Sequence, residues 1–372
     1  MTREERVPDV WHFVLLIACA VAIYLSCEWF VNAVEWLGHR LNVGKMAVGT
    51  VLAAFGTALP ESVVTLVAVT TGDGEAGKDI GVGAAMGGPL ALATVAYAVT
   101  GVALLWTRRS RDRARLAAAV PGGSATGADG RGEARGPGAA ASEVLTDPAE
   151  AARLAKDQRW FLAVFVFKVG LGLVAFAFKP WLGVVFFAVY AVYFWREMSG
   201  GDEDGGAGAE IDLEPLKLQP RREVPAGWAV AVQTLATLTV IFFASQLFVH
   251  QLDAIGPMIG LPAAVTALLL SPVATELPEI MNAVIWVRQG KTSLALANIS
   301  GAMMIQATVP SGLGLLFTPW KFDHALIWSG AMTMVAIAYL LATLRAHKLT
   351  PVRLAWTGAF YLVFAAGLVV IL

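Results

Sequence analysis

The chain has 372 residues, of which 57% are hydrophobic and 15% are charged, and its formal net charge is -1. This apolar content, together with 12 Trp and 18 Phe, is more than one soluble core of this size would bury. The composition therefore excludes an ordinary soluble domain and predicts a membrane protein with several spans. Both cysteines, Cys19 and Cys27, fall in the first apolar run, where we expect small buried side chains rather than a disulfide.

Apolar windows of about 20 residues, the length that crosses a bilayer, recur along the whole chain. Ten of them lie at residues 11–34, 46–71, 79–106, 159–178, 180–196, 226–250, 260–287, 292–317, 325–345 and 352–372. Two polar stretches interrupt the series. Residues 117–158 are expected to form a disordered cytoplasmic loop, because their first part is rich in Ala, Gly, Pro and Ser, and residues 197–225 an acidic cytoplasmic linker.

The basic residues predict how the chain is oriented. Five arginines between Arg108 and Arg115 follow the third window, which places that loop in the cytoplasm by the positive-inside rule. The other basic clusters fall on the same side, whereas the loop with Asp73 and Glu75 falls on the opposite side. We therefore expect both termini outside the cytoplasm, and the plasma (inner) membrane as the location.

The sequence also repeats itself. At an offset of 218 residues, Thr57, Pro60 and Glu61 align with Thr275, Pro278 and Glu279, respectively. The ten windows then divide into two halves of five, and an odd number makes the halves cross the membrane in opposite directions. The expected fold is an all-α membrane protein of ten transmembrane helices in two inverted five-helix repeats. The expected segments are 1–116 (helices 1 to 3), 117–158 (loop), 159–196 (helices 4 and 5), 197–225 (linker) and 226–372 (helices 6 to 10).

The repeated motif has the chemistry of a cation site. Proline lacks an N–H, so Pro60 frees the C=O of Gly56, and Pro278 frees the C=O of Ala274. Two glutamates, Glu61 and Glu279, offer four carboxylate oxygens and two charges, which suits the six to eight oxygen ligands that Ca2+ takes. Thr57 and Thr275 lie one helical turn before the glutamates, so their hydroxyls could complete a site for smaller monovalent ions.

At these residues the chain resembles the sodium/calcium exchanger family, whose two repeats carry a G-T-x-x-P-E motif. The resemblance covers all ten windows and implies Ca2+ ligation by Glu61 and Glu279 and Na+ binding by Thr57 and Thr275. The chain departs from the family at Gly83–Pro89 and Ala297–Met303, where G-N-x-x-G-S-N is usual and Asn298 alone keeps the amide. Gln306 is either a replacement oxygen or a hydrogen bond between helices. Glu276 is either a proton carrier or the partner of a hydroxyl.

These residues predict a secondary active antiporter that exchanges Ca2+ for Na+, with H+ coupling as the alternative and a cation channel as a further one. An enzyme is not expected, because the histidines are scattered and no HExxH motif occurs. No cofactor, nucleic acid or obligatory protein partner is expected; the partners are the transported cations and the bilayer. Glu28 is a secondary candidate, whereas Glu35, Lys168 and His250 are expected to anchor helix ends at the interface.

Overall fold

The structure is a computed structural model that describes residues 9–40, 53–72, 74–118, 144–145, 147–199 and 213–372. All regular secondary structure in these ranges is helical. The elements are α1 (Asp9–Arg40), α3 (Ala53–Thr71), α4 (Gly74–Ala91), η2 (Leu92–Ala96), α5 (Tyr97–Ala118), α6 (Pro148–Leu173), η4 (Lys179–Trp181), α7 (Leu182–Ser199), α8 (Gly227–Met258), α9 (Ala263–Thr275), α10 (Leu277–Arg288), α11 (Thr292–Phe317), α12 (His324–Arg345), α13 (Pro351–Ala355) and α14 (Thr357–Ile371).

Six helical runs in the described ranges are long and apolar enough to cross a membrane. They are Val10–Val34, Gly74–Ser110, Gly227–Met258, Thr292–Phe317, His324–Arg345 and Pro351–Ile371. Two shorter apolar helices, Pro60–Thr71 and Ala263–Val273, coincide with the second and seventh windows of the sequence. The all-helical class predicted from composition is therefore confirmed, while the count of ten spans stays a prediction.

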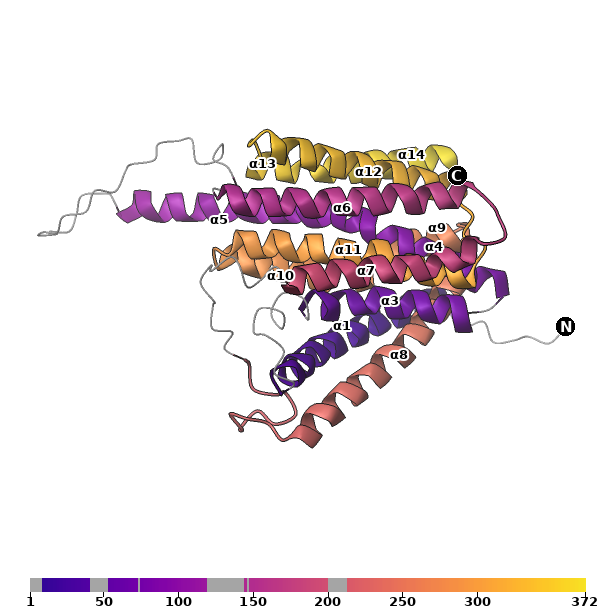
Figure 1. Cartoon of the computed structure of the whole chain (residues 1–372), viewed down its shortest axis with the longest axis horizontal. Coiled ribbons are helices and arrows are strands. Elements are labelled where there is room, and N and C mark those ends of the chain that lie inside the picture. The colour runs from indigo at the N-terminus through magenta and orange to yellow at the C-terminus, as the bar shows by residue number, and fades with distance from the viewer. Residues whose placement is uncertain (1–8, 41–52, 73, 119–143, 146, 200–212) are drawn as a thin grey trace, which may run out of the picture.

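The helices form an elongated bundle with an oblique pair at one edge. Most of them run side by side along the long axis, whereas α1 and α8 cross at an angle (Figure 1). This pair is antiparallel, because His12 near the start of α1 bonds Gln251 near the end of α8 at 2.8 Å, while Asn32 and Gln233 bond at 3.1 Å at the other end.

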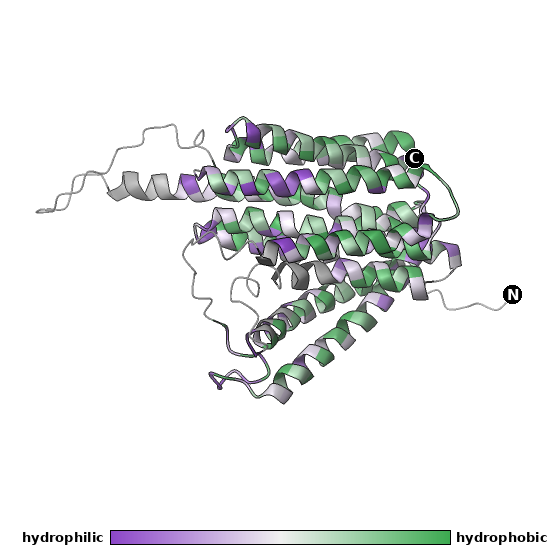
Figure 2. Cartoon of the chain, in the orientation of Figure 1, coloured by the Kyte–Doolittle hydropathy of each residue, from purple (hydrophilic) through white to green (hydrophobic). Residues whose placement is uncertain are grey.

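The outer surface of the bundle is apolar. Hydrophobic residues extend along most of the helices, and hydrophilic residues concentrate at one end of α5 and α6 (Figure 2). Large side chains point outward, with Trp106 70% and Val370 86% exposed. Exposing such a large apolar surface to water would cost free energy, whereas the lipid tails of a bilayer would cover it without that cost.

Two interruptions of the apolar pattern differ from what the sequence predicted. The part of 117–158 after Pro148 is helical, since α6 begins there with Asp147 as its N-cap, accepting from the Ala149 N–H at 2.9 Å. The expected start at 159 was wrong because the first turns of α6 are polar and carry no apolar window. Residues 119–143 of that loop lie outside the described ranges.

The 197–225 segment is structured at its end. Residues 200–212, which hold most of its acidic side chains, lie outside the described ranges. Beyond them, Leu216 is buried, and Trp36 of α1 donates to the Glu214 carbonyl at 2.9 Å. Glu28 lies 3.6 Å from the Lys217 ammonium, so this secondary candidate pairs with the linker at the edge of the bundle.

Candidate cation-binding site

The helix with the second Thr-x-x-Pro-Glu motif is broken inside the motif. α9 ends at Thr275 and α10 begins at Leu277, with Glu276 (φ -97, ψ -8) as the single residue between them. Pro278 lacks the N–H that would continue the helix, which explains the break. α3 instead runs without interruption through Pro60. The two motifs, matched in sequence, therefore differ in local structure.

Four polar side chains form a buried hydrogen-bonded chain at this break. The Thr275 hydroxyl lies 2.8 Å from Glu61 Oε2 and 2.9 Å from Glu276 Oε1, and Gln306 Nε2 donates to Glu276 Oε2 at 2.7 Å. All four residues are buried, with exposed fractions of at most 1%. The chain joins α3 to the α9–α10 break and to α11, so it connects the two halves of the sequence.

Oxygens in this cluster remain available to a cation. Glu61 Oε1 and Gln306 Oε1 are buried and have no hydrogen-bond partner among the described residues, and the same holds for the hydroxyls of Thr65 and Ser271. Buried oxygens without partners are costly unless a ligand or water satisfies them. Glu61 Oε1 and Gln306 Oε1 belong to side chains that are bonded to the cluster, a position expected of ligands for a hard cation.

Glu279 lies in the first turn of α10 and is fully buried. The positive end of the α10 dipole favours a carboxylate there. The structure thus buries both proline-linked glutamates, as the sequence predicted. It gathers no group of three or more His, Cys, Asp or Glu side chains in the described ranges into a metal-binding geometry.

Glycines bring α4 close to this cluster. A Cβ on Gly83 would lie 2.0 Å from the Ala264 carbonyl oxygen, and one on Gly88 would lie 2.8 Å from Gln306 Oε1 and 3.0 Å from Glu276 Oε1. Any side chain larger than hydrogen would therefore push α4 away from α9 or fill the site. The segment Gly83–Pro89 lacks the polar residues usual in the resembled family. Its glycines instead let the α4 backbone lie close to α9 and to the site.

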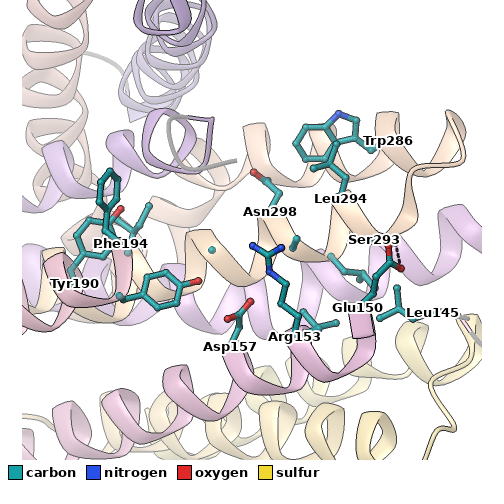
Figure 3. Close-up of a pocket in the computed structure, with 16 residues that line it drawn as sticks. Leu145, Glu150, Arg153, Asp157, Tyr190, Phe194, Trp286, Ser293, Leu294 and Asn298 are labelled. Atoms are coloured by element: carbon teal, nitrogen blue, oxygen red, sulfur yellow. Dashed lines mark hydrogen bonds between the residues drawn. The ribbon is translucent and has the colours of Figure 1, made fainter. Parts of the chain in front are cut away.

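Asn298 lies apart from the hydrogen-bonded chain. It precedes Gln306 by eight residues on α11, about 12 Å along the helix axis. It lines a cavity of about 320 Å³ between α6, α7 and α11, together with Arg153, Asp157 and Tyr190 (Figure 3). Its exposed fraction is 7%, and its Nδ2 has no partner among the described residues.

The remaining sequence candidates fall on positions that the structure does not describe in full. The side-chain positions of Gly56, Thr57 and Ala274 lie outside the described ones, so their roles stay predictions. Sequence reasoning missed Thr65 and Ser271, although each stands four residues from a candidate, the spacing that places two side chains on one helix face. It also misplaced Lys168, which is fully buried rather than anchored at the membrane interface.

Comparisons with known proteins identify the family of the chain. The sequence profile described as sodium/calcium exchanger protein matches residues 11–125 and 229–372. The chain belongs to this family. Its membership and its six apolar spans together make it an integral membrane protein.

Two curated relatives match part of the chain. CaxA of Alkalimonas amylolytica, named as an antiporter, is 28% identical over 166 residues, which cover 41% of this chain and 52% of that protein. The sodium/calcium exchanger MaX1 of Methanosarcina acetivorans is 27% identical over 147 residues, which cover 39% and 41%. The matched part thus spans about half the length of these relatives or less.

Solved structures share the fold over nearly the full chain. The H+/Ca2+ exchanger CAX superposes with a TM-score of 0.64 at 15% identity, covering 96% of this chain and 86% of that one. The sodium-calcium exchanger NCX_Mj, soaked with Na+ and Sr2+, gives 0.56 at 17% identity, with 96% and 99% covered. At these identities the likeness concerns the fold.

Proposed function

We propose that the protein is a secondary active antiporter that exchanges Ca2+ for Na+ by alternating access. The observation that carries this proposal is the buried contact between Glu61 of the first half and Thr275 of the second. A site that spans both halves changes its accessibility when one half moves against the other. Ten spans in two inverted five-helix repeats belong to the same proposal, supported by the sequence repeat and the family.

In this proposal the two proline-linked glutamates hold Ca2+. Glu61 and Glu279 balance its charge, and the freed carbonyls of Gly56 and Ala274 add neutral oxygens. Thr57, Thr275 and Gln306 provide oxygens for Na+, and Glu276 sets the charge of the site. Asn298, about two turns away, belongs to the path into the site rather than to its centre.

Cavities at the two ends of the bundle support such a path. The cavity with Asn298 extends along α11 to Ile305, the neighbour of Gln306, and its wall carries the carboxyl groups of Glu150 and Asp157 as well as Arg153. A second cavity of about 280 Å³ lies at the other end, between Thr71, Gln246 and Asp253. We assign the first to the cytoplasm, because Trp286 in its wall lies two residues before Arg288, the basic end of α10.

Proton coupling is the second candidate, and one observation favours it. The Thr275 hydroxyl lies within 3 Å of two carboxyl oxygens but carries a single hydrogen. When no cation is bound, a proton on Glu61 or Glu276 would allow both contacts to be hydrogen bonds. Glu276 could thus exchange a proton for a cation, which would make H+ the coupling ion.

Calcium uptake into proteoliposomes tests both candidates. We expect uptake under an outward Na+ gradient at clamped pH. Uptake driven only by an outward proton gradient would replace Na+ by H+ as the coupling ion. Uptake indifferent to both gradients would contradict antiport and indicate a channel.

The ligand assignment makes a separate prediction. Glu61→Gln and Glu279→Gln should each reduce Ca2+ uptake to background, because each removes half of the charge that balances Ca2+. Glu75→Gln is the matched control, since Glu75 is exposed at the start of α4. Uptake close to wild type in both site variants, at equal membrane insertion, would overturn the assignment.

A further inference from the structure

Lys168 of α6 is a lysine without exposure to solvent or lipid. Its exposed fraction is 0%, its Nζ donates to the Ala85 carbonyl of α4 at 2.9 Å, and Nζ lies 4.8 Å from the ring centroid of Phe165. An ammonium buried within a membrane protein costs several kcal/mol unless oxygens or π faces replace its hydration. The carbonyl and the ring are therefore its ligands.

The Ala85 carbonyl is free for this contact because of a proline. Pro89, four residues further along α4, has no N–H to donate back to it. The same geometry frees the carbonyls of Gly56 and Ala274, which we assign to the transported cation. The Lys168 ammonium thus contacts a third carbonyl that is freed by a proline, and we assign the other two to the transported cation.

The ammonium also lies beside the proposed site. Gly88, next to Pro89, is the residue whose Cβ would touch Glu276 and Gln306. The hydrogen bond of the Lys168 ammonium goes to the α4 backbone and not to a carboxyl group. Lys168 therefore contributes positive charge to the site without occupying the carboxylate oxygens themselves.

The second half has no counterpart to this arrangement. After the second helix of each half the repeat slips by about four residues, so that Gly83–Pro89 corresponds to Ala297–Met303. Met303, in the place of Pro89, has an N–H and leaves the carbonyl of Ile299 paired within α11, and the proline of that helix, Pro310, stands seven residues later. The helix that corresponds to α6 is α12, which has no charged residue between His324 and Arg345. Pro89 and Lys168 occur together in the first half, as expected if the function of the lysine is to donate a hydrogen bond to the carbonyl that the proline frees.

We propose that Lys168 is a tethered cation that takes the place of one monovalent ion in the transport site. This inference rests on the proposed antiport and sets its stoichiometry. A fixed ammonium cannot cross the membrane, so it satisfies oxygens and carboxylate charge without being transported. Each cycle then carries one fewer mobile monovalent ion per Ca2+ than the oxygens of the site could hold.

Equilibrium binding of 22Na+ to purified protein at clamped pH tests the proposal. Lys168→Met should bind one more Na+ per chain than wild type, whereas Lys168→Arg, which keeps the charge, should bind the same number as wild type. Sodium suits this test because a neutral carbonyl oxygen takes up Na+ but not a proton at neutral pH. An unchanged count in Lys168→Met would overturn the proposal.

A flux measurement gives an independent readout. In proteoliposomes with fixed Ca2+ and Na+ gradients, the reversal potential of Lys168→Met should correspond to one more elementary charge per Ca2+, and an unshifted value would count against a tethered cation. If Lys168→Met does not fold, Lys168→Leu, which also lacks both the charge and an N–H donor for the Ala85 carbonyl, is expected to show the same gain of Na+. Absence of Ca2+ uptake in wild type would refute the antiport itself, while the sodium count would still decide the role of Lys168.

Discussion

Thr275 connects two carboxyl groups with one hydroxyl. Its Oγ lies within hydrogen-bond distance of Glu61 and Glu276, and also 3.2 Å from the Ser271 carbonyl of its own helix. A side chain with one hydrogen and two lone pairs cannot donate to all three. The contacts must therefore rearrange when cations or protons enter, which makes Thr275 sensitive to the state of the site.

Removing this hydroxyl should weaken the monovalent ion more than Ca2+. Thr275→Val keeps the shape but leaves Glu61 and Glu276 without that hydrogen bond, a loss of about 1.5–3 kcal/mol for bonds to charged groups. The apparent Na+ affinity should fall about tenfold or more, whereas Ca2+ affinity should change less because no charge is lost. Competition binding of Na+ and 45Ca2+ measures both, and Thr275→Ser is the control. Equal losses for the two ions would contradict separate roles.

At the scale of elements, the packing of α4 on α9 sets the distance between these two helices beside the site. Gly83 lets the α4 backbone approach the Ala264 carbonyl, and the buried face of α4 continues from there to Gly88 at the site. Backbone atoms cannot move aside as a flexible side chain can, so the distance between these helices is set by the absent Cβ.

Two glycine-to-alanine changes should therefore have opposite effects. Gly83→Ala places a Cβ 2.0 Å from the Ala264 carbonyl oxygen and should lower stability by about 1–3 kcal/mol through overpacking. Gly170→Ala in α6 meets nothing within 4 Å and should raise stability slightly, since alanine favours helix by about 0.5–1 kcal/mol. Thermal unfolding in detergent compares them. A melting temperature that falls equally in both variants would show that helix contact at Gly83 is not the cause.

The sequence predicted the bounds of the helices better than the contacts between them. Apolar windows placed α11 and α12 within one residue of their bounds, because both helices are apolar throughout. The windows missed the polar start of α6, and helical periodicity alone could not show that α9 ends at Thr275. Contacts such as Glu61 with Thr275 depend on the rotation of helices more than 200 residues apart in the chain, which no local pattern encodes. Lys168 was misplaced because its hydrogen-bond partner, the Ala85 carbonyl, comes from α4.

At the scale of the whole molecule, the cluster of five arginines between Arg108 and Arg115 lies at one end of the bundle. The start of α1 and the C-terminus lie at one end of the bundle, and the arginine-rich end of α5 lies at the other (Figure 1). The 213–226 segment with Arg221 and Arg222 precedes α8 and packs on the end of α1, as the bond from Trp36 to Glu214 shows. The arrangement of the described helices is thus compatible with the arginine-rich end of α5 on one side of the membrane and the start of α1 and the end of α14 on the other.

Labelling of single cysteines tests this orientation. In a chain with Cys19→Ala and Cys27→Ala, which removes the two buried thiols, Glu75→Cys should react with an impermeant maleimide added to intact cells. Arg222→Cys should react only after the membrane is permeabilised, because the positive-inside rule places its segment in the cytoplasm. Both positions are exposed in the structure, so protection of one would come from the membrane rather than from burial. The reverse pattern would invert the topology and assign the cavity at Asn298 to the outer side, so that it would admit cations from outside the cell.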